Sequence, residues 1–251
     1  ITPAGSAAVT AFGPFLTSKV YSAAVNGASA YMDGTGDTLR ATWTAADIIN
    51  QNFTLEYWLY YTQTSGYGTV SIGANNNTAG YTSLTYLASN GQVFSDDGQN
   101  SGSGPDAGAG AISPNSWNHL ALVRVSNDMF IYINGAKIAT KAITASLFQG
   151  QSGEFGIGYI ANPLEGYICD ARVVTSAVYT GDTYTVPTAP LTAVTNTKLL
   201  LNMADGQAID SAAQNNLTLA GTAKTSTAQK KFGTASILFD GNSDYAYTTV
   251  S

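Results

Sequence analysis

The sequence predicts an all-β protein built as an antiparallel β-sandwich. Short alternating apolar segments, separated by turn-forming residues, occur throughout its 251 residues, and no segment shows a helical period of comparable strength. The clearest example runs from Trp117 to Ala139, where two strands and the start of a third follow one another. Asn134-Gly135 is the strongest hairpin signal, because both central residues of a type I′ turn need a positive φ.

Composition narrows the class of protein. Charged residues make up 10% of the chain, far below the usual quarter, so hydroxyl and amide side chains must solvate the surface. This composition is typical of extracellular and virion β-proteins and fits an ordinary β-sandwich equally well. The net charge of −6 argues against binding of nucleic acid and against electrostatic docking to an anionic membrane. No apolar run approaches the ~20 residues of a membrane span.

Further strands are predicted on both sides of this meander. The segment from Phe53 to Tyr61 carries aromatic residues on both faces, which indicates a central strand covered on both sides. Asp96 to Gly110 is expected to be a long loop without core residues. The other predicted strands are Ala8 to Phe12, Ser29 to Met32, Gly68 to Ile72, Tyr81 to Leu87, Gln92 to Phe94, Ser152 to Tyr159 and Gly166 to Val174.

The C-terminal part of the chain repeats the N-terminal part. Gly233 to Asp244 matches Asn26 to Asp37 at an offset of 207, and Leu217 to Ala223 matches Ile1 to Ala7 at an offset of 216. The first copy therefore carries about nine extra residues, placed near Gly13 to Ser22.

The repeat divides the chain into three parts. Residues 1–181 are expected to form a sandwich, 182–197 a Thr- and Pro-rich linker or edge-covering segment, and 198–251 an incomplete second copy. Each copy lacks predicted strands that are present in the other copy. Either the chain is an excerpt of a longer tandem-repeat protein, or Leu199 to Met203 fills the vacant strand position of the first unit, in the same chain or a neighbouring subunit.

Four motifs resemble laminin-G-like, concanavalin-A-like jelly-roll domains, and the resemblance covers roughly residues 20–181 and again 198–251. The motifs are FDGNSDY (239–245), NFTLEYWLY (52–60), WNHLALVR with IYING (117–124 and 131–135) and GYICDARV (166–173). The resemblance implies a jelly roll. Thr38 and Cys169 depart from the family pattern, which usually has tyrosine and an acidic residue at these positions.

Long, Thr-rich tandem copies of this kind resemble structural proteins of marine bacteriophages, cyanophages in particular. The resemblance implies a place in a tail, fibre or capsid appendage.

No catalytic residue is predicted. His119 is the only histidine and Cys169 the only cysteine, and both are interpreted as structural core residues. The glutamates Glu56, Glu154 and Glu165 stand alone, without the paired carboxylates that a glycosidase needs. Membership of a fold does not by itself confer activity.

Two ligand sites are considered, and no cofactor is expected beyond calcium. Asp96 and Asp97 with Asn100, or Asp33 with Asp37, could supply oxygen ligands to calcium, although such Gly- and Asp-rich loops are more often ordinary turns. Sugar binding would use aromatic faces and amide groups. The candidates are Tyr60, Tyr67, Tyr81 and Asn76.

The expected function is a non-enzymatic structural or adhesive module on the exterior of a phage virion. Its partners would be other virion proteins, copies of itself and host-surface glycans, with avidity from repeated weak contacts. The alternative is a secreted, lectin-like carbohydrate-binding domain, calcium-dependent or not.

Overall fold

The computed structural model describes residues 2–4, 8–10, 12–15, 27–42, 51–72, 84–96, 103–143, 154–158, 162–203, 208–209, 216–220, 222–226, 228 and 236–247. Strands within these ranges pair antiparallel, and the ranges contain no helix. No helix capable of crossing a membrane therefore occurs in this part of the chain. The all-β prediction is confirmed.

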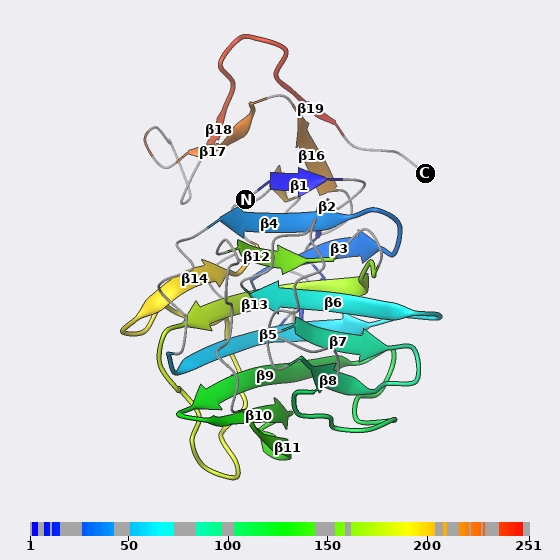
Figure 1. Cartoon of the computed structure of the whole chain (residues 1–251). Coiled ribbons are helices and arrows are strands. Elements are labelled where there is room, and N and C mark those ends of the chain that lie inside the picture. The colour runs from blue at the N-terminus through cyan, green and yellow to red at the C-terminus, as the bar shows by residue number, and fades with distance from the viewer. Residues whose placement is uncertain are drawn as a thin grey trace.

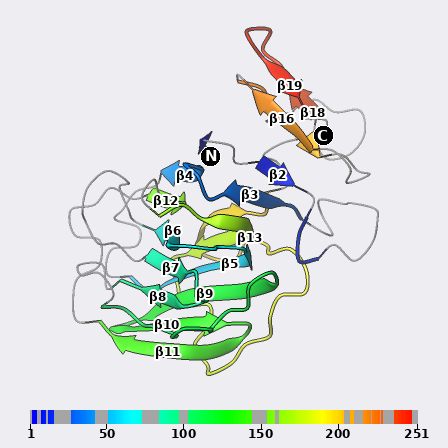
Figure 2. The same ribbon diagram turned by 90° about the vertical axis from the view of Figure 1, so that its right-hand side faces the viewer.

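Two sheets stack face to face in a sandwich (Figures 1 and 2). The smaller sheet has the order β1-β4-β12-β6-β7-β8, and the larger has the order β11-β10-β9-β5-β13-β3-β2, with β14 also paired to β13. The smaller sheet comprises β1 (Thr2–Ala4), β4 (Thr38–Thr42), β6 (Tyr67–Ile72), β7 (Leu84–Ala88), β8 (Val93–Ser95) and β12 (Glu154–Ile157). The larger sheet comprises β2 (Ala8–Thr10), β3 (Ser29–Asp33), β5 (Phe53–Tyr61), β9 (Trp117–Val125), β10 (Asp128–Ile133), β11 (Ala136–Ala142), β13 (Glu165–Val174) and β14 (Thr197–Leu201).

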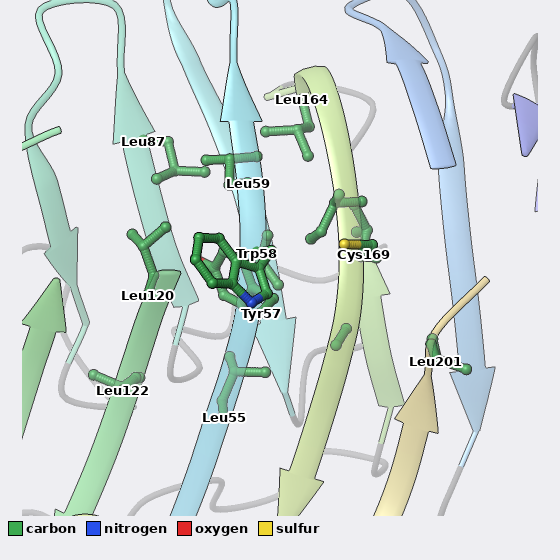
Figure 3. Close-up of a cluster of buried hydrophobic side chains, with 14 of the residues drawn as sticks. Leu55, Tyr57, Trp58, Leu59, Leu87, Leu120, Leu122, Leu164, Cys169 and Leu201 are labelled. Carbon is green, nitrogen blue, oxygen red and sulfur yellow. The ribbon is translucent and has the colours of Figure 1, made fainter. Parts of the chain in front are cut away.

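The core lies between the sheets and is centred on β5. Strand alternation sends every second side chain of β5 inward, and these five are fully buried: Phe53, Leu55, Tyr57, Leu59 and Tyr61. Figure 3 shows Leu55 of β5 beside Leu122 of β9, and Leu59 of β5 beside Leu87 of β7. Each fully buried apolar side chain of this size contributes about 1.5–3 kcal/mol, so β5 anchors the sandwich.

The opposite face of β5 is covered as well, which confirms the prediction of a central strand. Thr54 donates a hydrogen bond to the carbonyl of Ser176 and accepts one from the Val178 amide, both at 2.9 Å. The Phe15 ring packs edge-on against Trp58, with 5.7 Å between centroids. Segments before β3 and after β13 therefore cover this outer face of the larger sheet.

The segment 182–197 follows β13, pairs with the edge strand β11 and then crosses the outer face of the larger sheet. Thr183 forms an antiparallel bridge with Ala136, and the Lys137 amide donates to the Asp182 carbonyl at 2.9 Å. The Tyr184 amide donates to the Gly135 carbonyl at 2.8 Å, and the Leu191 amide donates to the Asp170 carboxylate at 3.2 Å. Arg172 donates to the Thr192 carbonyl at 2.6 Å. We call residues 175–197 the strap, because hydrogen bonds at several points hold it to the larger sheet.

The strand predicted at Leu199 to Met203 fills a position in the first unit, within the same chain. β14 pairs with β13 from Leu201 opposite Ala171 to Thr197 opposite Val174. β3 occupies the other half of the same β13 edge, and the β13 register shifts near Asp170, which has a φ of 49°. The pairing hypothesis is therefore confirmed in its same-chain form.

The four-strand arrangement of β1 to β4 occurs a second time. β16 (Asn216–Ala220) pairs with β19 (Tyr245–Tyr247), and β17 (Lys224–Ser226) pairs with β18 (Ser236–Leu238), while β15 (Ala208–Ile209) adds to β16. Every paired position agrees with the offsets found in the sequence. Ala220 opposite Tyr245 corresponds to Ala4 opposite Thr38, for example.

The turn that joins β3 to β4 has the same hydrogen bond as the turn that joins β18 to β19. The amide of Asp33 donates to the Asp37 carboxylate at 2.8 Å, and the amide of Asp240 donates to the Asp244 carboxylate at 2.7 Å. The carboxylates therefore hold the turn backbone. The change of offset falls between β2 and β3, where the sequence predicted the extra residues.

One expectation was wrong. The stretch from Asp96 to Gly110 was expected to lack core residues, yet Asp96 is fully buried. The Gly104 amide donates to the Ser95 carbonyl at 3.0 Å, and the Ala107 amide donates to the Val93 carbonyl at 2.9 Å. Backbone pairing with β8 thus packs residues 103–107 onto the sheet. Strands β1 and β4 were not predicted, because their short polar sequences lack a clear alternation.

The Asn134-Gly135 hairpin is confirmed, with φ of 48° and 85° at the two positions. A Cβ on Gly135 would lie 2.6 Å from the Tyr184 carbonyl oxygen, whereas a Cβ on Gly36, at φ 72°, meets no atom within 4 Å. We expect Gly135→Ala to lower the free energy of unfolding by about 3 kcal/mol and Gly36→Ala by only about 1 kcal/mol. Urea denaturation of both variants measures the difference. Equal losses would contradict the close approach of the strap.

Candidate functional site

Four aromatic side chains stand in direct register across adjacent strands of the larger sheet. Trp117 of β9 lies opposite Tyr60 of β5, Tyr60 lies opposite Tyr167 of β13, and Tyr167 lies opposite Tyr31 of β3. We call these four residues the aromatic row. They lie on the outer face, because the alternating neighbours of Tyr60, Leu59 and Tyr61, point into the core.

The spacing of the row follows from the sheet. Adjacent strands lie about 4.8 Å apart, so rings at matched positions contact one another in sequence. The centroid distances are 5.6 Å from Trp117 to Tyr60, 5.9 Å from Tyr60 to Tyr167 and 4.9 Å from Tyr167 to Tyr31. These values fall in the favourable range for aromatic pairs. The interplanar angles are 63°, 82° and 41°, so the rings pack mainly edge to face.

Phe12 lies over the row from the segment that follows β2. Its ring centroid is 4.9 Å from that of Tyr60, 4.8 Å from that of Tyr167 and 5.4 Å from that of Trp117. The Phe12 and Tyr31 side chains are 38% and 37% exposed, and the other three rings are half-buried. This partly exposed aromatic cluster is therefore the candidate binding surface.

The row is uncharged. Burial, followed by the neighbouring tyrosines Tyr31 and Tyr60, raises the pKa of the Tyr167 hydroxyl above its ordinary value. Its phenol therefore stays neutral at physiological pH. Chemically, the aromatic row offers ring surfaces for contact with a ligand and neutral hydroxyls for hydrogen bonds.

The structure separates the predicted sugar-binding residues. Tyr60 belongs to the aromatic row. Tyr67 is 45% exposed on the outer face of the smaller sheet, where its ring packs edge-on against Phe94 at 5.7 Å, so it lies on the other side of the sandwich. Tyr81 and Asn76 fall outside the described residues. The other row members were missed, because alternation within one strand does not reveal cross-strand register.

The structure does not bring the predicted calcium ligands together with other acidic side chains among the residues that it describes. These described residues contain no group of three or more potential ligands of the histidine, cysteine, aspartate and glutamate types. Of the predicted ligands, Asp96 is fully buried, and Asp97 and Asn100 lie outside the described ranges. Calcium binding at these three residues stays a prediction.

A second group of functional side chains lies buried beneath the strap. Glu56 accepts hydrogen bonds from Arg172 Nε at 2.8 Å and Nη2 at 2.6 Å, and from the Tyr179 hydroxyl at 2.6 Å. His119 Nε2 lies 3.5 Å from the same carboxylate, and His119 Nδ1 lies 2.5 Å from the Tyr184 hydroxyl. We call these five residues the Glu56 cluster.

His119 lies between two partners of the cluster: its Nδ1 shares a hydrogen bond with the Tyr184 hydroxyl, and its Nε2 faces the Glu56 carboxylate at 3.5 Å. Desolvation acts to raise the pKa of Glu56, but interactions with His119, Tyr179 and Arg172 outweigh it, so the pKa lies below its ordinary value. Burial, together with the negative charge of Glu56, raises the pKa of both tyrosine hydroxyls.

The cluster ties the strap to the sheet. Glu56 and His119 have no exposed surface, and Tyr179 and Tyr184 of the strap stack at 3.8 Å above them. Cys169 nearby is 1% exposed, and burial raises the pKa of its thiol well above the ordinary value. Its interpretation as a buried small residue is confirmed.

Glu56→Gln should destabilise the fold, because it leaves the buried Arg172 without its counter-charge. We expect a loss of about 3 kcal/mol at pH 7. The Glu56 pKa lies below its ordinary value of 4.5, so its stabilisation is present above about pH 4.5 and is lost as the pH falls through the folded-state pKa. The wild-type and Glu56→Gln stabilities should therefore converge in acid.

Urea denaturation at pH values from 3 to 7, in steps of about one pH unit, measures this convergence. Asp182→Asn is the matched control, since Asp182 pairs with Lys137 at 2.9 Å through a side chain that is 96% exposed. A pair this exposed contributes little to stability, because solvent screens it. A Glu56→Gln loss no larger than that of Asp182→Asn would refute the role of the cluster.

Comparisons with solved structures returned sandwich domains of low identity. Domain 4 of AbnA, an extracellular GH43 arabinanase from Geobacillus stearothermophilus in complex with arabinotriose, is 20% identical with a TM-score of 0.49; the match covers 70% of this chain and 78% of that one. The binding domain of botulinum neurotoxin DC in complex with rat synaptotagmin II is 14% identical with a TM-score of 0.49, covering 71% of this chain and 43% of that one.

A heptameric SAP-like pentraxin from Limulus polyphemus is 17% identical with a TM-score of 0.39, and the match covers 60% of this chain and 77% of that one. No curated protein sequence matches the chain. A laminin-G-type family model, described as the concanavalin A-like lectin/glucanases superfamily, matches residues 33–181, which is more than half of the chain. The match includes β5, β9, β10 and β13, the strands whose motifs carried the resemblance in the sequence. The chain therefore belongs to the concanavalin A-like lectin/glucanases superfamily.

Proposed function

We propose that this chain is a non-enzymatic adhesive module of a phage virion exterior, and that it binds glycans through the aromatic row. The observation that carries the proposal is the row itself, a set of aromatic side chains in matched register on an outer sheet face that Phe12 covers in part. A sheet rarely places large aromatic rings side by side on its outer surface without a partner to bind.

The chemistry of the row favours sugars. The apolar faces of pyranose and furanose rings stack on aromatic rings, and tyrosine hydroxyls supply neutral hydrogen bonds. The row carries no charge, and the net charge of the chain is −6, which disfavours anionic partners. The occupant we propose is therefore a neutral glycan of the host surface.

The arrangement of the glutamates supports a non-enzymatic role. Retaining and inverting glycosidases need two carboxylates facing the scissile bond. Glu56 is committed to its buried cluster, and the Glu165 carboxylate accepts a hydrogen bond from the Thr64 amide at 3.1 Å. Neither carboxylate is presented to a substrate on the row.

The repeated four-strand arrangement supports a structural role. Strands β1 to β4 and β16 to β19 pair in the same register, and repeated modules raise total binding through effective concentration without new contacts. Partners in the particle would be other virion proteins or further copies of the same domain. This placement extends the likeness of the sequence to phage appendage proteins.

Binding to immobilised linear neutral oligosaccharides tests the glycan-binding role. Arabino-oligosaccharides are the first members of the panel, followed by xylo-, manno- and gluco-oligosaccharides. We expect Tyr31→Ala and Tyr60→Ala to weaken binding about tenfold, which corresponds to about 1.4 kcal/mol. Tyr67→Ala is the matched control, because Tyr67 is an exposed tyrosine on the opposite face.

Equal weakening by Tyr67→Ala, or no binding to any member of the panel, would refute the role of the row. Urea denaturation of each variant separates loss of binding from loss of folding. Repeating the titration with a chelator distinguishes calcium-independent stacking, which we expect, from a calcium-dependent lectin.

Immunogold labelling tests the proposed location. Antibodies raised against this chain should decorate tails, fibres or capsid appendages of intact phage particles. Labelling confined to lysed cells or to the particle interior would contradict an exterior position.

A further inference from the structure

We infer that Phe12 occupies the central sugar position of the aromatic row in the free protein, and that a linear neutral glycan must displace it. This inference rests on the proposed function, since it describes how the same surface is regulated. In the free protein, Phe12 of the same chain fills the site on the row, a condition we call self-occupancy. The ligand that replaces Phe12 runs across the strands.

Phe12 covers the centre of the row. Its centroid lies 4.8–5.4 Å from the centroids of Tyr60, Tyr167 and Trp117, close to the 4.9–5.9 Å that the row members keep among themselves. The interplanar angles are 82° to Tyr60 and 67° to Tyr167. Phe12 therefore stands on the row as an additional ring that belongs to none of its strands.

The contacts that hold the Phe12 backbone do not involve its ring. Its amide donates to the Thr10 hydroxyl at 3.1 Å, and its carbonyl accepts a hydrogen bond from the Ser29 hydroxyl. Phe15, buried against Trp58, anchors the same short segment. The Phe12 side chain can therefore leave the row by rotation about χ1 while the backbone stays in place.

The exposure of the ring indicates that this exchange needs little rearrangement. Phe12 is 38% exposed, whereas Phe15, three residues later, is 8% exposed. Both phenylalanines contact aromatic side chains of the same sheet face, but only Phe15 is enclosed. Phe12 thus covers the row without being part of the core.

The shape of the row selects the class of ligand. Its rings advance by about one strand spacing at each step, about 4.8 Å, which is close to the length of one sugar unit in an extended chain. The row crosses four adjacent strands, and Tyr31 at one end is 37% exposed. The matching ligand is an unbranched, neutral oligosaccharide of about four units, at one unit for each strand spacing.

Self-occupancy lowers the apparent affinity. When only a fraction of the molecules has the site vacant, the apparent Kd rises in inverse proportion to that fraction. A single module then binds weakly, and firm attachment needs several modules acting together. Phe12 therefore keeps the affinity of each single module low, so that attachment depends on several modules binding together.

Isothermal titration of the full chain with linear arabino-, xylo-, manno- and gluco-hexaose tests the inference. We expect Phe12→Ala to bind about three- to tenfold more tightly than the wild type, because the vacant state becomes fully populated. Phe239→Ala is the matched control, since Phe239 is also exposed, at 48%, but lies outside the row. It should leave the Kd unchanged.

The wild-type protein offers an independent measurement. Nuclear Overhauser contacts between the Phe12 and Tyr167 rings should be lost when the protein is saturated with the hexaose that binds best. This experiment needs no substitution and therefore does not depend on the folding of a variant.

The outcomes separate the two proposals. The inference fails if the wild type binds and Phe12→Ala binds equally or more weakly, or if the contacts between the Phe12 and Tyr167 rings persist at saturation. In either case Phe12 is a permanent part of the binding site, and the proposed function stands. If no form binds any hexaose, both fail. If Phe12→Ala binds more tightly and Phe12→Ala/Tyr60→Ala loses the gain, both are supported.

Discussion

The structure depends on the burial of both faces of β5. One face supplies five fully buried side chains to the core between the sheets, as in any sandwich. The other face carries Glu56, and a buried carboxylate is unfavourable unless it is paired and hydrogen-bonded. Arg172 comes from the adjacent strand, and Tyr179 comes from the strap. The need to satisfy one carboxylate therefore explains why the chain after β13 folds back over the sheet.

The outer face of β5 has two regions, one that is covered and one that is partly open. Near Glu56, the strap and its stacked tyrosines exclude solvent and hold the sheet polar groups in fixed hydrogen bonds. Towards Tyr60, the face carries aromatic side chains that Phe12 covers only in part. Polar interactions thus stabilise one region, while exposed apolar surface remains available for binding at the other. The two regions share strands β5, β9 and β13, so the rigidity of the first preorganises the second.

The second set of strands shows how far local sequence specifies pairing. β16 to β19 adopt the register of β1 to β4, including the aspartate-held turn, although the two sets of residues lie at opposite ends of the sequence. Each pair is antiparallel and short, and its register agrees with the two offsets of the sequence repeat. β14 shows a different principle, since it joins the first unit by adding to an edge of β13 that β3 leaves uncovered.

The sequence by itself determined the strands whose signals are local: β5 through its alternation, β9 to β11 through the meander and the Asn134-Gly135 turn, and β13 through its motif. It also determined the superfamily and offered Tyr60 as a binding residue. Only the tertiary structure decided which side chains meet. Trp117, Tyr167, Tyr31 and Phe12 gather around Tyr60 through register between distant strands, and Glu56 finds Arg172 across 116 residues. Periodicity shows which face a side chain takes within its own strand. The neighbours of a side chain across the sheet depend on strand order, bulges and the path of the strap. These features arise from the packing of the whole chain, so the local pattern does not reveal them.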